Sequence, residues 1–177
     1  THPQRENFLL AAAWWRAAGL REPVLYAAAR NYEIGPHRLA RIGESAGAIW
    51  WDDSKATNFH ATEAALSQFG GKVVLIAGGK SKGGNIEAFV DRIQSRLKHV
   101  LLIGETRNIL ATLFGAAGVP HTVCEDLAGA VRGAINVSAS GDDILLSPGF
   151  SSLDQFADYA ERGEAFVQLL KSAPHSS

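Results

Sequence analysis

Three short segments of the sequence place charged and hydroxyl side chains where an apolar run gives way to a helical pattern. The first segment, residues 52–58, follows the apolar run 48–51 and reads Asp-Asp-Ser-Lys-Ala-Thr-Asn. It crowds two acids, a lysine and three hydroxyl or amide groups into one junction. Such junctions hold ligands in open α/β sheets, because their polar groups lie past the carboxyl ends of the strands. A helix starting near His60, capped by Thr57 or Asn58, is expected to follow.

The second segment, residues 78–85, is rich in glycine and carries two lysines: Gly-Gly-Lys-Ser-Lys-Gly-Gly-Asn. Glycines let backbone N–H groups approach an anion closely, and the terminus of the helix that follows adds partial positive charge. We therefore expect an anionic ligand here. The spacing fits neither the dinucleotide-binding pattern nor the Walker pattern. A flexible glycine turn with solvated lysines is the simpler alternative.

The third segment, residues 147–154, again follows an apolar run and precedes a helical pattern: Ser-Pro-Gly-Phe-Ser-Ser-Leu-Asp. Its serines and the N-terminal amides of the helix could hold a carboxylate. The alternative is that Ser152 or Asp154 only caps the helix. The three segments would open on the same edge of a parallel sheet, and this convergence predicts a binding site.

The elements that position these segments alternate between strands and helices, which predicts an α/β fold. We expect a Rossmann-like, mostly parallel sheet with helices on both faces, preceded by a short helical hairpin. The expected strands are 39–42, 48–51, 72–77, 100–103, 121–123 and 143–146. The last helix is expected at 155–171, with a possible break near Tyr159.

Gly35-Pro36 breaks the chain, and we place a domain boundary there, between residues 1–35 and 36–177. The sequence contains no methionine, and it begins at Thr1 in what already resembles the approach to a helix. We therefore expect it to be part of a longer protein.

Composition excludes several classes of function. A formal net charge of -1 gives no electrostatic reason to expect a nucleic acid or a membrane surface as partner. The single Cys124 cannot form an internal disulfide, and no apolar run approaches the roughly 20 residues needed to cross a bilayer. We expect a cytoplasmic protein. The six histidines lack metal-ligand spacing, so we expect no metal site in this chain.

Several motifs occur together in a recognisable order. The motif D-S-K-A-T-N occupies residues 53–58, and G-G-x-x-K-G occupies residues 78–83. Other matching segments are Pro36-His37-Arg38, Ser147-Pro148, Ser152-Leu153-Asp154 and Arg162-Gly163. Together they resemble the Mur ligase family, and within it the enzymes that add D-glutamate to UDP-N-acetylmuramoyl-L-alanine. The resemblance runs from about Gln4 to Leu170.

The resemblance implies an ATP-dependent ligase of peptidoglycan synthesis that works through an acyl phosphate. Residues 36–177 would be its carboxy-terminal amino-acid-binding domain, and residues 1–35 a helical remnant of its central ATPase domain. The P-loop, the Mg²⁺ ligands and the UDP-binding domain would lie outside this chain, which would be inactive alone. The implied partners are D-glutamate, ATP and UDP-N-acetylmuramoyl-L-alanine, and we expect a monomer.

The resemblance also implies roles for individual residues. The catalytic candidates, near the ATP phosphates, are Lys55 and Arg38. The residues implied at the ribose and the adenine of ATP are Asp53, Gln4 and Asn7. Those implied around D-glutamate are Thr57, Lys82, Ser152, Leu153 and Tyr159. A dicarboxylate needs cations and amide donors at two separated places, which Lys82 and the serine segment offer.

Two other classes of function are open. One is a stand-alone Rossmann-like module that senses a nucleotide or another small anion. The other is a structural or interaction domain, which does not explain three polar segments at one sheet edge.

Overall fold

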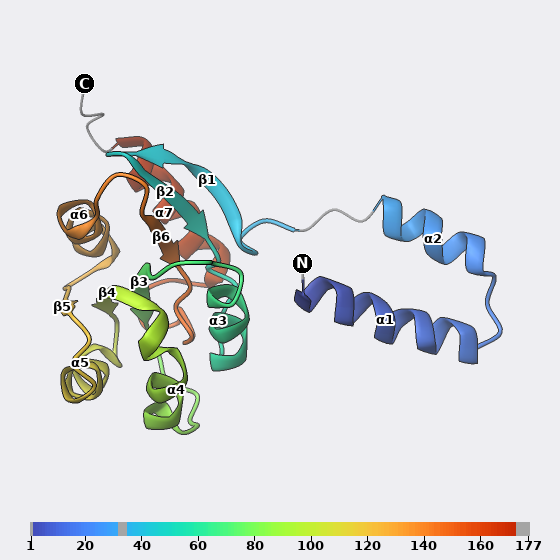
Figure 1. Cartoon of the computed structure of the whole chain (residues 1–177), viewed down its shortest axis with the longest axis horizontal. Coiled ribbons are helices and arrows are strands. Elements are labelled where there is room, and N and C mark those ends of the chain that lie inside the picture. The colour runs from blue at the N-terminus through green and yellow to red at the C-terminus, as the bar shows by residue number, and fades with distance from the viewer. Residues whose placement is uncertain (1, 32–34, 173–177) are drawn as a thin grey trace. The chain divides into compact units, whose positions relative to one another are not determined.

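The computed structural model describes the backbone of residues 2–31 and 35–172, and the side chains of 7–31 and 35–172 (Figure 1). The chain divides into two compact units, Thr1–Gly35 and Pro36–Ser177. Each unit is described by itself.

The first unit is a pair of helices, α1 (His2–Ala17) and α2 (Glu22–Arg30). Gly19 turns the chain between them with a φ of 68°, a conformation in which glycine carries no steric penalty. Pro23 lies in the first turn of α2, where the missing N–H costs no helical hydrogen bond. The indole of Trp15 donates to the backbone oxygen of Arg21 across 3.0 Å and closes the turn. The predicted helical hairpin is confirmed.

The second unit is built on a six-stranded sheet with the order β1-β2-β6-β3-β4-β5. The strands are β1 (Ala40–Ser45), β2 (Ala48–Asp52), β3 (Val73–Gly78), β4 (Leu97–Ile103), β5 (His121–Val123) and β6 (Asp143–Leu146). The β1–β2 pair is antiparallel, and every other pair is parallel. The predicted fold class is therefore confirmed.

The antiparallel pair turns at Ala46 and Gly47, whose φ values are 52° and 76°. Two consecutive positive φ values define the tight turn that matches the twist of a hairpin. After this turn β2 runs parallel to its neighbour β6. The carboxyl end of β2 therefore lies at the same edge of the sheet as the carboxyl ends of the other parallel strands.

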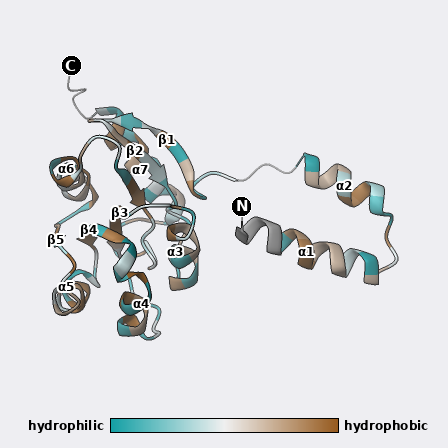
Figure 2. Cartoon of the chain, viewed as in Figure 1, coloured by the Kyte–Doolittle hydropathy of each residue, from teal (hydrophilic) through white to brown (hydrophobic). Residues whose placement is uncertain are grey.

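Helices cover both faces of the sheet and enclose two apolar cores (Figures 1 and 2). The helices α3 (Phe59–Leu66), α4 (Ile86–Ile93) and α5 (Arg107–Ala116) pack on one face, and α6 (Leu127–Val137) and α7 (Tyr159–Ser172) pack on the other. Residues of β3 alternate between the two cores, so the strand is apolar and fully buried throughout.

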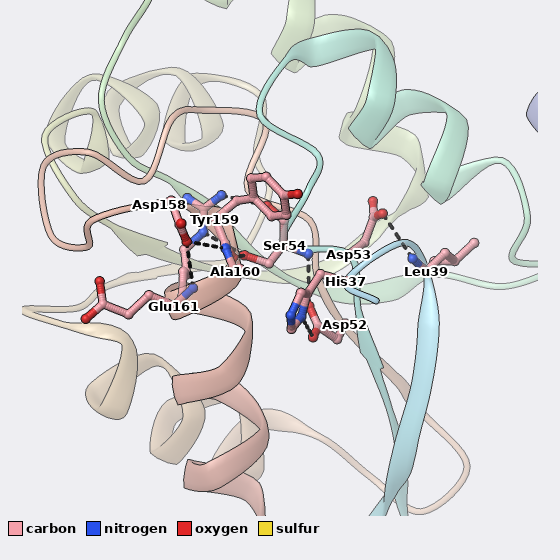
Figure 3. Close-up of polar contacts among 10 residues, drawn as sticks. His37, Leu39, Asp52, Asp53, Ser54, Asp158, Tyr159, Ala160 and Glu161 are labelled. Carbon is pink, nitrogen blue, oxygen red and sulfur yellow. Dashed lines mark hydrogen bonds and ion pairs between the residues drawn. The ribbon is translucent and has the colours of Figure 1, made fainter. Parts of the chain in front are cut away.

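Side-chain caps fix where α3, α4 and α7 begin. Asn58 caps α3 and Asn85 caps α4 by accepting a backbone N–H from the first turn. The α7 helix begins at Tyr159, because the carboxylate of Asp158 accepts the N–H groups of Ala160 and Glu161 at 2.8 and 2.9 Å (Figure 3). The predicted start at Gln155 is therefore wrong, and the cap is neither Ser152 nor Asp154.

Within the ranges that the structure describes, no helix combines the length and the apolar character that a membrane span requires.

Candidate functional site

The candidate site is formed by three loops at the carboxyl ends of three adjacent strands. The first loop (53–58) follows β2, the second (79–85) follows β3, and the third (147–158) follows β6. Since these strands are neighbours in the order β2-β6-β3 and run parallel, their loops open on one edge of the sheet. The third loop therefore lies between the other two.

Backbone hydrogen bonds join the third loop to both neighbours. The N–H of Gly149 donates to the oxygen of Ala56 in the first loop at 2.9 Å. Lys80 and Ser151 exchange two backbone hydrogen bonds, at 2.8 and 3.1 Å, between the second and third loops. A Cβ at Gly79 would lie 2.2 Å from the oxygen of Ser151, so this close approach requires glycine.

Asp53 ties the first loop to two other segments. Its Oδ1 accepts the N–H of Leu39 at 3.1 Å (Figure 3), and its Oδ2 accepts the hydroxyl of Ser147 at 2.8 Å. Burial raises the pKa of Asp53 to about 7, and the nearby charge of Asp52 adds to this, whereas the two hydrogen bonds and Arg38 oppose it. The carboxyl group therefore titrates near neutral pH.

A buried pair is formed by His37, near the start of the second unit, and Asp52, the last residue of β2 (Figure 3). The Nδ1 of His37 lies 2.6 Å from Oδ2 of Asp52, whose other oxygen accepts the N–H of Ser54 at 2.9 Å. The backbone of His37 has a φ of 61°. A Cβ at Gly163 would lie 2.2 Å from the same Nδ1, so the imidazole fits against α7 only because this position is glycine.

Arg162, from α7, holds the first and third loops together. Its guanidinium donates to the hydroxyl and the backbone oxygen of Ser54 at 3.0 and 2.8 Å, and to the backbone oxygen of Phe150 at 3.3 and 3.4 Å. Only 1% of Arg162 is exposed. Burial lowers its pKa to about 10, a value at which the group stays charged at neutral pH, with Asp154 and Asp52 opposing the shift.

The side chain of Lys55, in the first loop, meets that of Tyr159, the first residue of α7. The ammonium nitrogen of Lys55 lies 3.0 Å from the phenol oxygen and 4.8 Å from the ring centroid. The two residues are 104 positions apart in the sequence. The fold therefore brings together a predicted phosphate-side residue and a predicted glutamate-side residue.

The other predicted site residues lie at different depths. Arg38 is exposed, and its charge acts on the nearby carboxyl of Asp53. Lys82 is exposed on the second loop, and Thr57 is half-buried on the first. In the third loop Ser152 is buried, whereas Leu153 is 59% exposed.

The predicted adenine contacts belong to the first unit. Asn7 is exposed on α1, whereas the side chain of Gln4 lies outside the described residues. Their role stays a prediction.

A fourth loop, after β4, completes the edge and was not predicted. The hydroxyl of Thr106 lies 3.0 Å from the backbone oxygen of Gly79 and 3.2 Å from its nitrogen. The N–H of Glu105 donates to Asp154 at 2.7 Å. The position of this fourth loop between an apolar strand and a helix is the signal in the sequence that could have revealed the loop. The sequence singled out Arg162 only as part of the Arg162-Gly163 motif, and no local signal indicated that its side chain is buried.

A groove of about 680 Å³ lies between α6, α7 and the last residues of the third loop. Its apolar lining includes Leu127, Phe156 and Leu169, and it contains neither Lys55 nor Lys82. We place the candidate site at the loops because the charged and hydroxyl groups gather there. Among the described residues, no group of three or more His, Cys, Asp or Glu side chains could hold a metal ion.

The family model for the glutamate ligase domain of Mur ligases matches residues 37–150. This chain belongs to the Mur ligase family. The match includes Arg38 and all of the first and second loops, and it ends within the third loop.

Two Mur ligase relatives cover most of the chain. It is 42% identical over 142 residues to the UDP-N-acetylmuramoylalanine-D-glutamate ligase of Thermotoga maritima, a match covering 80% of this chain and 32% of that enzyme. It is 39% identical over 167 residues to the enzyme of the same name from Halalkalibacterium halodurans, covering 94% of this chain and 37% of that enzyme. The chain thus spans about a third of the length of these relatives.

A solved structure shows the same Mur ligase fold. The UDP-N-acetylmuramate-alanine ligase of T. maritima superposes with a TM-score of 0.68 at 14% identity, covering 98% of this chain and 39% of that one.

Proposed function

We propose that this chain is the amino-acid-binding part of a ligase that adds D-glutamate to UDP-N-acetylmuramoyl-L-alanine in peptidoglycan synthesis. The observation that carries the proposal is the contact of the first loop, which holds the D-S-K-A-T-N motif, with the third loop. It is made in a chain 42% identical to a UDP-N-acetylmuramoylalanine-D-glutamate ligase. Cations and buried hydroxyl groups gather at this edge, which suits a substrate with two carboxylates.

The proposed reaction has two steps. The carboxyl group of UDP-N-acetylmuramoyl-L-alanine takes the terminal phosphoryl group of ATP, giving an acyl phosphate and ADP. The amine of D-glutamate then attacks the acyl carbon, an amide bond forms, and inorganic phosphate leaves with the proton of the amine released to solvent. Cations stabilise the charge that develops on the transferred phosphoryl group.

Residues of this chain have separate proposed roles in that reaction. Lys55 and Arg38 neutralise phosphate oxygens, and Asp53 lies at the ribose. Gln4 and Asn7 contact the adenine. The residues around D-glutamate are Thr57, Lys82, Ser152, Leu153 and Tyr159.

The proposed ligase also requires Mg²⁺ with ATP. On the resemblance to the Mur ligases, we place the Mg²⁺ ligands and the P-loop in the part of the relatives that this chain does not cover. The unit 1–35 would be the end of the central ATPase domain, and closure of the domains would bring Lys55 and Arg38 to the phosphates. The isolated chain would then be inactive.

The proposal is tested by supplying the complete protein with ATP, Mg²⁺, UDP-N-acetylmuramoyl-L-alanine and D-glutamate. Mass spectrometry should find one new amide product, in a one-to-one ratio with released phosphate, and L-glutamate should give far less product. Absence of product would overturn the proposal. The 177-residue chain is titrated with ATP by calorimetry in parallel. If this chain binds ATP tightly and the complete protein forms no product, the results would instead favour a stand-alone nucleotide-binding module.

A further inference from the structure

The contact between Lys55 and Tyr159 has a fixed hydrogen-bond direction. A lysine ammonium group has three donors and no acceptor, so across the 3.0 Å contact the phenol oxygen must accept. The hydroxyl proton of Tyr159 therefore points away from Lys55. Among the described residues, the phenol makes no second hydrogen bond, so this proton and two ammonium protons are available to a ligand.

The backbones of both residues are held in place. The hydroxyl of Ser54 donates to the backbone oxygen of Tyr159 at 2.7 Å, and the same hydroxyl accepts from Arg162. The N–H of Lys55 donates to the backbone oxygen of His37 at 3.0 Å. The tyrosine ring meets the imidazole of His37 edge-on, with centroids 6.5 Å apart. The backbone positions from which the side chains of Lys55 and Tyr159 extend are therefore fixed.

Both side chains are half-buried. Partial burial strengthens an interaction with an anion, because less water screens the charge. Holding the lysine against the phenol also restricts a side chain that otherwise loses about 2 kcal/mol of rotamer entropy when a ligand fixes it. The pair is thus organised before a ligand arrives.

We propose that the hydroxyl of Tyr159 and the ammonium group of Lys55 together bind one anionic group of ATP or of D-glutamate. The anion is a phosphate or a carboxylate, since both offer oxygens that accept from two neighbouring donors. This inference rests on the proposed ligase function and adds to it a direct role for the phenol hydroxyl. It also assigns to one anion two side chains that the proposed function places at different substrates, so it moves one of them to the other's substrate. A phenylalanine at position 159 would keep the ring and lose that donor.

The substitution Tyr159→Phe in the complete protein tests this role, because it removes one hydroxyl and leaves the packing unchanged. Loss of a hydrogen bond to a charged group should raise one KM roughly tenfold or more. A rise confined to the KM for ATP identifies a phosphate, and a rise confined to the KM for D-glutamate identifies a carboxylate. Changes of less than twofold in both KM values would overturn the proposal.

A double-mutant cycle separates joint binding from a structural effect. If both groups hold one anion, Tyr159→Phe should have less than a twofold further effect on that KM when Lys55→Gln is already present. Fully additive effects would contradict joint binding. The matched control is Tyr26→Phe, which removes a hydroxyl from an exposed tyrosine on α2 and should leave both KM values unchanged.

Failure of this inference is distinguishable from failure of the proposed function. If the wild-type protein forms no amide product, the proposed function fails. The anion site of Lys55 and Tyr159 is then tested by calorimetry, in which the wild type and Tyr159→Phe are each titrated with inorganic tripolyphosphate and with D-glutamate. Weaker binding of either probe by the variant would support the anion site. Equal binding of both probes by the two proteins would overturn it.

Discussion

The carboxylate of Asp53 accepts a hydrogen bond from the hydroxyl of Ser147 at 2.8 Å, although 94 positions separate the two residues in the sequence. This contact joins the ends of β2 and β6. Because the carboxyl group is buried and its pKa is raised to about 7, the contact has consequences for stability that can be measured.

The stability of the chain should fall as the pH rises from about 4 to about 7. In this range the unfolded chain has lost the proton of Asp53, whereas the folded chain still holds it, so the folded state binds more protons. Over this pH range the free energy of unfolding of the wild type should fall, relative to that of Asp53→Asn, by on the order of 3 kcal/mol, since each pKa unit is worth about 1.4 kcal/mol. Urea titrations at several pH values measure it. Asp91→Asn, at an exposed site on α4, is the control, and a pH-independent effect of Asp53→Asn would contradict the raised pKa.

Arg162→Lys should destabilise the fold by roughly 2–3 kcal/mol, because one ammonium group cannot replace the hydrogen bonds of the guanidinium to Ser54 and Phe150. Hydrogen exchange should also become faster in the first and third loops. The same substitution at the exposed Arg132 should change stability by less than about 0.5 kcal/mol. Equal effects at the two positions would show that Arg162 does not hold the loops together.

Gly163→Ala and Gly115→Ala should have effects of opposite sign, although both glycines lie in helices. A Cβ at position 163 would lie 2.2 Å from Nδ1 of His37, so we expect a loss of about 1–3 kcal/mol. A Cβ at position 115 meets only an ordinary contact at 3.5 Å, so alanine should stabilise α5 by up to about 1 kcal/mol. Thermal unfolding of the two variants decides this. Stabilisation by Gly163→Ala would mean that the imidazole of His37 does not pack against α7.

Lys82→Ala should reduce ligation strongly in the complete protein and leave folding nearly unchanged. Lys82 is exposed, and substitutions at exposed sites usually change stability by less than about 0.5 kcal/mol. Steady-state kinetics with D-glutamate, together with a urea titration, measure both effects. Lys72→Ala is a matched control, since Lys72 is exposed just before β3, at the other end of that strand. A large loss of stability in Lys82→Ala would favour a structural role for this loop.

Local patterns in the sequence were sufficient for the fold class and for the positions of the first, second and third loops. The apolar runs 73–77 and 100–103, within two of the predicted strands, indicated buried strands, because continuous apolar character is typical of parallel strands covered on both faces. The start of α7 was predicted four residues too early, since the residues from Gln155 to Asp158 are compatible with a helix, and only the cap formed by Asp158 shows where the helix begins.

The sequence by itself determined which residues follow each strand, because hydrophobic periodicity and turn residues act over a few neighbouring positions. Only the tertiary structure decided that β6 lies between β2 and β3, and therefore that the third loop touches both others. It also decided that Tyr159 meets Lys55 and that Arg162 is buried beneath the first loop. These contacts join residues about a hundred positions apart. They depend on strand order and close packing, which no local pattern in the sequence encodes.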